Sequence, residues 1–214
     1  MYHYKKIGLL ADSHGNLPAT VAAIECLQAN GAQQLYHLGD LFDSIHDNDF
    51  SSIFQLVKRH QVLAVKGNND YQVERAFKNG ADSCLSPADS LSLADYLALL
   101  PMKRELAYAC MTHSLPYEDV RAFYEPMDDG STRPATRVFK ATDYPLICCG
   151  HSHHPVLFTW RAGEVSRERM TGRNQVHFLP GQRYILIVGS VEKGDCGILD
   201  FDMNTYQGFR IFNK

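Results

Sequence analysis

The chain has 214 residues, of which 45% are hydrophobic and 21% charged, with a formal net charge of −3 and a pI near 6.3. This length fits one domain with a substantial core, and the slightly acidic charge gives no electrostatic basis for binding nucleic-acid polymers or anionic membranes. The apolar stretch near the N-terminus is too short for a signal peptide, and no apolar run approaches the roughly 20 residues of a membrane helix. We therefore expect a single cytoplasmic domain over residues 1–214.

Strand and helix patterns alternate over the first 70 residues. Short apolar runs that end in glycine-bearing polar turns predict three strands, at 5–12, 34–40 and 61–70. Apolar residues at helical spacing predict two helices between them, at 17–31 and 47–60. The order β-α-β-α-β implies parallel strands joined by helical crossovers.

The pattern changes after a short predicted helix at 89–101. Six β-rich runs predict a second, partly antiparallel sheet, at 104–114, 144–155, 155–160, 175–180, 183–190 and 196–202. The segment from about 115 to 143 is polar, and we expect it to be an insertion with loops and a helix. Residues 161–175 are expected to form a polar turn region.

Polar side chains follow the predicted strands in both halves. The strands of the first half end in ADSHGN, GD and GNND, and the second half adds THS and GHSH. In open α/β sheets, ligands bind outside the carboxyl ends of the strands. Seven side chains that can ligate metals would meet there: Asp12, His14, Asp40, Asn68, His113, His151 and His153. This set suffices for two divalent cations that share a carboxylate, and its nitrogen and oxygen donors suit borderline transition metals.

The order D-x-H, G-D, G-N, H and G-H-x-H resembles the calcineurin-like metallophosphoesterase superfamily. The later segment YILIVGSVEKGDCGILDFD is similar to a strand turn of its small bacterial phosphodiesterase branch. The resemblance implies an α/β (α+β) fold, a four-layer α-β-β-α sandwich of two mixed sheets flanked by helices. It also implies one metal held by Asp12, His14 and His153, another held by Asn68, His113 and His151, and Asp40 bridging the two.

The same resemblance implies a dinuclear metal-dependent phosphodiesterase that hydrolyses a small phosphoester or nucleotide by attack of a metal-bridging water. The cofactors would be two divalent ions per chain, with Mn as first choice and Fe, Zn, Ni or Co as alternatives. Two other functions stay open: a phosphomonoesterase or nucleotide pyrophosphatase at the same site, and a non-catalytic scaffold like an endosomal coat subunit that uses this fold. The presence of all seven candidate ligands favours an enzyme.

Two departures bear on the catalytic residues. No arginine follows the second motif closely in GDLFDSIHD, and Asn69 stands where the protein phosphatases of the superfamily have a histidine. Both departures argue against a protein phosphatase and favour the phosphodiesterase branch. We name Asp40, through the metals that it would bridge, and Asn69 as the catalytic candidates; a carboxamide does not ionise near pH 7, so Asn69 cannot replace histidine as a proton donor.

Other residues have weaker assignments. Arg121, Arg133 and Arg137 could clamp a phosphoryl group as part of a lid, although a solvated loop is the favoured explanation. His154 could line the rim, and Asp43 or a backbone carbonyl could orient the metal-binding histidines. The remaining histidines are expected at the surface or satisfied in the core: His3, His37, His46, His60 and His177. The six cysteines form no C-x-x-C pair, so we expect reduced thiols packed as small apolar groups.

Overall fold

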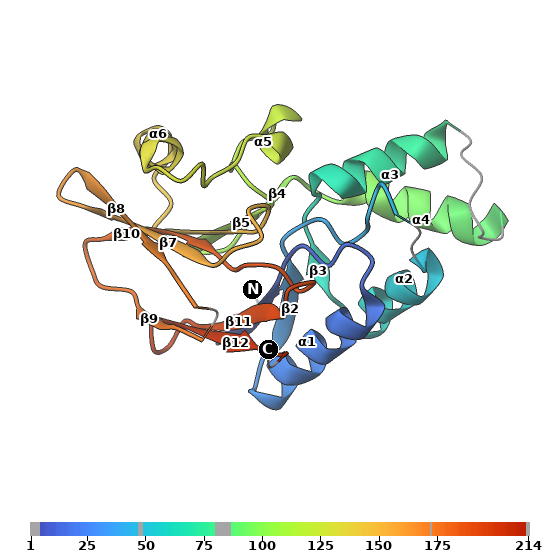
Figure 1. Cartoon of the computed structure of the whole chain (residues 1–214), viewed down its shortest axis with the longest axis horizontal. Helices are drawn as coiled ribbons and strands as arrows, with labels where there is room; N and C mark the ends of the chain where they lie inside the picture. Colours follow the sequence, from blue (N-terminus) through green and yellow to red (C-terminus); the bar gives the residue numbers. More distant parts are fainter. Residues whose placement is uncertain (1–4, 47–48, 80–86, 172, 213–214) are drawn as a thin grey trace.

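Two six-stranded mixed sheets form the centre of the computed structural model, which describes residues 5–46, 49–79, 87–171 and 173–212 (Figure 1). Sheet A has the order β3-β2-β1-β11-β12-β9, from strands β1 (Lys6–Leu10), β2 (Gln34–His37), β3 (Leu63–Ala64), β9 (Gln175–His177), β11 (Asp195–Asp200) and β12 (Thr205–Arg210). Sheet B has the order β4-β5-β6-β10-β7-β8, from strands β4 (Lys103–Glu105), β5 (Ala109–Thr112), β6 (Leu146–Cys149), β7 (Val156–Arg161), β8 (Glu164–Arg169) and β10 (Arg183–Ile187).

Helices cover the outer face of each sheet. On sheet A lie α1 (Leu17–Ala29), α2 (Phe50–Arg59) and α4 (Pro87–Leu99), whose residues Leu27, Ile53 and Leu97 share one apolar cluster. On sheet B, Val138 and Phe139 of α6 (Arg133–Ala141) pack with Ile185 in another. A third cluster fills the space between the two sheets. The expected four-layer α-β-β-α sandwich is confirmed.

The central strands are buried on both faces, which explains their continuous apolar sequences. Along β6, Leu146 and Cys148 belong to the cluster between the sheets, whereas Ile147 and Cys149 belong to the cluster under α6. Successive side chains of a strand point to opposite faces, so a strand covered on both sides shows no polar alternation.

The assignment of strands to sheets was wrong for two of the predicted runs. The runs at 175–180 and 196–202 were expected in the second sheet, but β9 and β11 belong to sheet A, where β11 pairs antiparallel with β1. The chain crosses back to sheet A after β10, and β12, which was not predicted, joins β11 to β9. Apolar patterns identify strands, but hydrogen-bonding partners depend on how the chain crosses between layers.

Two further elements differ from the expectation. The region 161–175 contains strand β8, which pairs with β7 at the edge of sheet B and has mostly exposed residues, so its sequence lacks the apolar half of a strand pattern. Helix α3 (Asn68–Lys78) was not predicted; it begins directly after β3, where the Asp70 carboxylate accepts a hydrogen bond from the Gly67 N–H at 3.0 Å.

The segment 115–143 contains α5 (Arg121–Tyr124) and α6, so the helix expected there is confirmed. Its apolar residues Met127, Ala135 and Phe139 are buried in the outer layer of sheet B. The division into one domain with an insertion stays a prediction.

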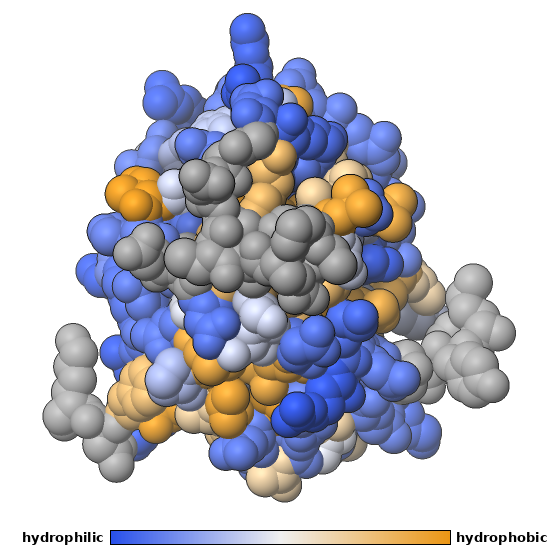
Figure 2. Space-filling model, turned by 90° about the vertical axis from the view of Figure 1, so that its right-hand side faces the viewer, coloured by the Kyte–Doolittle hydropathy of each residue, from blue (hydrophilic) through white to orange (hydrophobic). Residues whose placement is uncertain are grey.

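The surface at the α2–α4 end is mainly hydrophilic, with apolar residues lying among polar ones (Figure 2). Within the described residues, none of the helices combines enough length and hydrophobicity to span a membrane.

Candidate metal centre

The seven predicted ligands lie at the carboxyl ends of β1, β2 and β3 in sheet A and of β5 and β6 in sheet B. Their backbone is unusual. Eight non-glycine residues among those described have a positive φ, and five of them are predicted ligands: Asp12, His14, Asp40, His151 and His153. Left-handed conformations are uncommon and cluster at functional sites, although aspartate and histidine tolerate them better than most residues. The fold therefore holds these side chains in directions that ordinary strand ends would not give.

One group of donor atoms joins the loop after β1 to the loop after β6. His14 Nε2 lies 3.1 Å from His153 Nε2, and His153 Nε2 lies 3.7 Å from Asp12 Oδ1. Ligand atoms of all three residues lie within 4.8 Å of one another, which is close enough to surround one ion. This is the set that the family resemblance implied for the first metal.

A second group joins β3, β5 and β6. His113 Nε2 lies 3.0 Å from Asn68 Oδ1, and His151 Nδ1 lies 3.1 Å from both of these atoms. Two imidazole nitrogens and an amide oxygen thus converge, as the implied second metal requires.

Asp40 lies between the two groups. Its Oδ2 is 3.8 Å from His14 Nε2, and its Oδ1 is 3.5 Å from His113 Nε2. Ligand atoms of Asp12, Asp40 and His113 also lie within 4.8 Å of one another, so the two carboxylates are close neighbours. This position suits the bridging role predicted for Asp40.

Two glycines allow these loops to approach one another. A Cβ on Gly67 would lie 2.1 Å from Asp40 Oδ1, and a Cβ on Gly150 would lie 2.6 Å from Asp12 Oδ2. Both distances are shorter than any normal contact, so a side chain at either position would displace a carboxylate. The glycines of the G-N and G-H motifs are therefore required by packing.

Hydrogen bonds around the site fix the acidic loop. Asp70 is fully buried and its carboxylate accepts the backbone N–H groups of Asp40, Leu41, Phe42 and Gly67 at 2.9 to 3.2 Å. It thereby ties the loop after β2 to the start of α3. Asp70 was not among the predicted site residues, although its place three residues after Gly67, in the first turn of a helix, is a sequence signal for a capping carboxylate.

Backbone carbonyls orient two of the histidines. His113 Nδ1 lies 2.9 Å from the Leu38 carbonyl oxygen, which leaves Nε2 directed at Asn68 and Asp40. The His151 side chain hydrogen-bonds the backbone of Tyr124 in α5. Of the two alternatives considered for orienting histidines, a carbonyl serves His113, whereas Asp43 contacts the exposed His46, 2.7 Å away.

The electrostatics of the site favour cations. Burial and the nearby Asp40 raise the pKa of Asp12 well above its usual value. Burial also raises the pKa of Asp40, but His113 and the hydrogen bonds from Asn69 outweigh it, so the net shift is downward. Among the described residues, neither carboxylate pairs with a lysine or arginine. Two buried acids without a strong cationic partner are costly unless a cation joins them.

The histidines of the site are also suited to binding cations. Burial and neighbouring histidines lower the pKa of both His151 and His153 to about 4, so both rings are neutral near pH 7 and can offer a lone pair. Paired imidazole nitrogens about 3 Å apart are an arrangement that a metal ion between them explains. The donor set therefore fits divalent transition metals.

Asn69 lies behind Asp40. Its backbone N–H donates to Asp40 Oδ1 at 2.8 Å and its Nδ2 donates to Asp40 Oδ2 at 2.7 Å, while its Oδ1 accepts the Ser44 N–H at 3.2 Å. Both ends of the carboxamide are engaged. The geometry describes a residue that positions Asp40.

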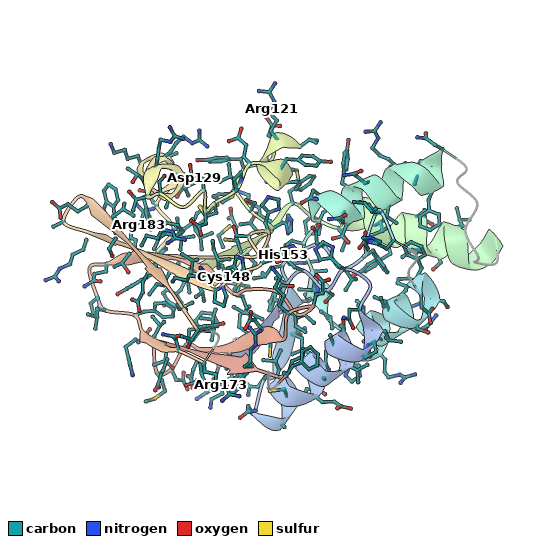
Figure 3. The ribbon with its side chains drawn as sticks, in the orientation of Figure 1. Arg121, Asp129, Cys148, His153, Arg173 and Arg183 are labelled. Carbon is teal, nitrogen blue, oxygen red and sulfur yellow. The ribbon has the colours of Figure 1, made fainter. Side chains whose placement is uncertain are left out.

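The predicted substrate-binding residues are less close to this cluster. Arg121 points outward from α5, whereas His153 lies in the middle of the molecule (Figure 3). Arg133 pairs with Asp129 at 3.4 Å and Arg137 pairs with Glu125 at 2.8 Å, both at exposed positions. His154 is exposed beside the His153 ligand position. Their proposed roles as a lid and a rim stay predictions.

The other histidines are outside the cluster, and His3 lies outside the described residues. His37 is buried; its Nε2 lies 2.8 Å from Ser13 Oγ, its Nδ1 has no partner among the described residues, and burial lowers its pKa to about 3. His60 contacts Gln28 and His177 is exposed on β9. The described cysteines, Cys26, Cys110, Cys148, Cys149 and Cys196, are free thiols, and Cys84 lies outside the described residues.

Comparisons with known proteins agree with the resemblance seen in the sequence. Residues 6–183 match the model of the calcineurin-like phosphoesterase superfamily domain. The phosphodiesterase YfcE of Escherichia coli strain K12 is 33% identical over 78 residues, which cover 33% of this chain and 42% of YfcE. The chain thus matches less than half the length of this curated relative.

Solved structures resemble the whole fold. A metallophosphoesterase from Sphaerobacter thermophilus has a TM-score of 0.77 at 22% identity, covering 99% of this chain and 90% of that one. A hypothetical protein from Pyrococcus horikoshii OT3 has a TM-score of 0.64 at 14% identity, covering 98% and 88%. At such identities the likeness concerns the architecture.

Proposed function

Since the chain belongs to the calcineurin-like phosphoesterase superfamily, we propose that it is a dinuclear metal-dependent phosphodiesterase that hydrolyses a small phosphoester or nucleotide. The observation that carries this proposal is the convergence of two buried carboxylates, an amide and four histidines from five strand ends. The partial match to the phosphodiesterase YfcE supports a diester over a monoester as substrate.

The residues have distinct roles in this proposal. Asp12, His14 and His153 would hold one cation, Asn68, His113 and His151 the other, and Asp40 both. Two bound divalent ions supply an activated water near neutral pH and neutralise charge that develops on the phosphoryl oxygens. Asn69 holds the Asp40 carboxylate directly, through its Nδ2. Asp70 holds the Asp40 backbone by accepting its N–H. The Leu38 carbonyl fixes the His113 ring so that one nitrogen faces the site.

Hydrolysis of bis-p-nitrophenyl phosphate tests the function. We expect turnover with Mn²⁺, loss of turnover with a chelator, and recovery when Mn²⁺ or Ni²⁺ is restored. Parallel assays with p-nitrophenyl phosphate and a dinucleotide separate the phosphomonoesterase and pyrophosphatase alternatives. A protein that binds two metal ions per chain but hydrolyses none of these esters would contradict the proposed activity and favour a scaffold.

A further inference from the structure

The turn between β10 and β11 packs against the metal centre, although it supplies none of the seven ligands. Ser190 Oγ donates to the Asp12 carbonyl oxygen at 2.9 Å, and the Glu192 N–H donates to the same oxygen at 3.3 Å. The Val191 N–H donates to the Ala11 carbonyl at 2.8 Å. Three hydrogen bonds therefore fasten the turn Ser190–Gly194 to the backbone that carries Asp12.

The same turn lies beside the loop that carries His153. Gly189, which has φ +96°, leads into it, and a Cβ there would lie 3.0 Å from Pro155 Cγ and 2.8 Å from Asp195 Cβ. Within the turn, the Asp195 N–H donates to the Ser190 carbonyl at 2.8 Å and the Gly194 N–H to the Val191 carbonyl at 2.9 Å. The turn is thus rigid and occupies the space between two ligand loops.

Lys193 projects from this turn. It is exposed, and no hydrogen bond or ion pair joins its ammonium group to another residue in the described part of the chain. The Lys193 backbone N–H donates to the Ser190 carbonyl at 3.1 Å, and the preceding Glu192 N–H donates to the Asp12 carbonyl. The Lys193 backbone is therefore held next to the segment that carries Asp12, a ligand of the first metal set.

The other cations are less well placed for this position. Arg133 and Arg137 are paired with acids on the outer helices, and Lys66 is paired with Glu74 at 2.7 Å. The sequence also lacks the arginine that the superfamily's protein phosphatases carry after the second motif. A positive charge for the phosphoryl group is therefore still required, and Lys193 is a cation that the fold holds next to the Asp12 segment.

We propose that Lys193 binds the phosphoryl group of the substrate, an inference that rests on the proposed function. Phosphate oxygens that are not bound to metal need a cationic donor, and lysine serves as a mobile point charge at the end of a flexible chain. The rigid turn sets the position of the Cα, and the four-carbon stem lets the ammonium follow the substrate. Lys193 then belongs to substrate binding and does not hold metal.

Binding of inorganic phosphate to the Mn²⁺-loaded protein tests the proposal without catalysis. Calorimetric titration of Lys193→Gln should show phosphate bound about tenfold more weakly than by wild type, as expected for loss of one charge-assisted hydrogen bond. Lys193→Arg should retain most of the affinity. The matched control Lys58→Gln makes the same charge change on the exposed face of α2 and should leave phosphate affinity unchanged. All variants should carry the same number of metal ions per chain.

Several outcomes would overturn the proposal. One is unchanged phosphate affinity in Lys193→Gln at full metal occupancy. Another is equal loss in Lys193→Gln and Lys193→Arg together with lower thermal stability, which would assign the residue to the structure of the turn. A different result would contradict only the proposed function: wild type hydrolyses no phosphoester, but its phosphate binding still depends on Lys193. In an active enzyme, Lys193→Gln should raise KM more than it lowers kcat.

Discussion

Sheet A brings two carboxylates, one carboxamide and one histidine to the candidate metal centre, whereas sheet B brings three histidines. The acids of sheet A are held by N–H donors: Asp12 accepts the His151 backbone N–H at 2.9 Å, and Asp40 accepts two bonds from Asn69. On sheet B, backbone carbonyls accept from the rings of His113 and His151.

The two sheets thus meet two different requirements of a metal site, namely attraction of cations and preference for one kind of metal. The buried carboxylates of sheet A attract cations of any kind, while imidazoles from sheet B favour transition metals over calcium or magnesium. We therefore expect changes on sheet A to alter how much metal is bound, and changes on sheet B to alter which metal is bound.

The largest effect should follow from removing the shared carboxylate. Asp40→Asn should lower kcat/KM by about 10³-fold and reduce metal occupancy, because both ions would lose a negative ligand. Asn68→Ala and His153→Asn each affect one neutral ligand and should cost about tenfold less. Metal analysis and kinetics on the same samples check this. Two tightly bound ions per chain in Asp40→Asn would show that Asp40 does not bridge.

Gly67→Ala should weaken metal binding about 10–100-fold without changing any ligand, because its methyl group would displace the Asp40 carboxylate. Titration of the metal-free protein with Mn²⁺ measures the change. The control Gly163→Ala adds a methyl group where nothing lies within 4 Å, at φ +89°, so it should lose stability but keep its metal affinity. Equal metal affinity in both variants would contradict the packing argument.

Asp70 should affect stability in a pH-dependent way. Burial and the charge of Asp40 raise its pKa to about 7 from an ordinary value of 3.8. Between these values the unfolded side chain is ionised and the folded one is protonated, so unfolding releases a proton and rising pH favours the unfolded state. Asp70→Asn should lose about 1–3 kcal/mol of stability, because one of the two oxygens that accept the backbone N–H groups is replaced by a donor NH2 group.

The pH dependence can be isolated by comparing wild type with Asp70→Asn in metal-free form. The stability advantage of wild type should shrink as the pH rises from about 4 to 7, by at most about 1.4 kcal/mol per pH unit. Urea unfolding at several pH values measures it. A constant difference would mean that the folded protein keeps Asp70 ionised throughout this range.

Replacing Asn69 should change moderately how the rate depends on the leaving group. Since both ends of its carboxamide are engaged, it offers no proton, and general acid assistance typically contributes about 10²–10⁴-fold for poor leaving groups. A plot of kcat/KM against leaving-group pKa should therefore fall steeply, and less steeply for Asn69→His if the new ring reaches the leaving oxygen. A flat plot for wild type, with chemistry rate-limiting in single turnovers, would reveal another proton donor.

The smallest effect is expected from thiol alkylation, which tests the core of sheet B. Cys148 and Cys149 are fully buried, and burial raises the pKa of both thiols. Treatment of the folded, metal-loaded protein with iodoacetamide should leave its activity unchanged. Lost activity with both metals retained would place a reactive thiol at the site.

Much of the site was predictable because its ligand residues occur in short sequence motifs. A strand end followed by Asp-x-His or Gly-His-x-His already contains the ligand types, and parallel strands bring their carboxyl ends to one edge. The sandwich followed from the family resemblance. The contacts that require Gly67 and Gly150, and those of Asp70 with the loop after β2, could not be predicted, because each involves a neighbour 27 or more residues away along the chain.

The sequence by itself determined most of the strands, which strand ends carry candidate metal ligands and which family the chain resembles, since these are properties of local pattern. Only the tertiary structure decided that β11 returns to pair with β1, that Asn69 engages both oxygens of Asp40, and that Lys193 lies beside the loop that carries Asp12. Pairing partners and the environment of a side chain arise from layers packing against each other, and the free energy of that packing depends on the whole chain at once.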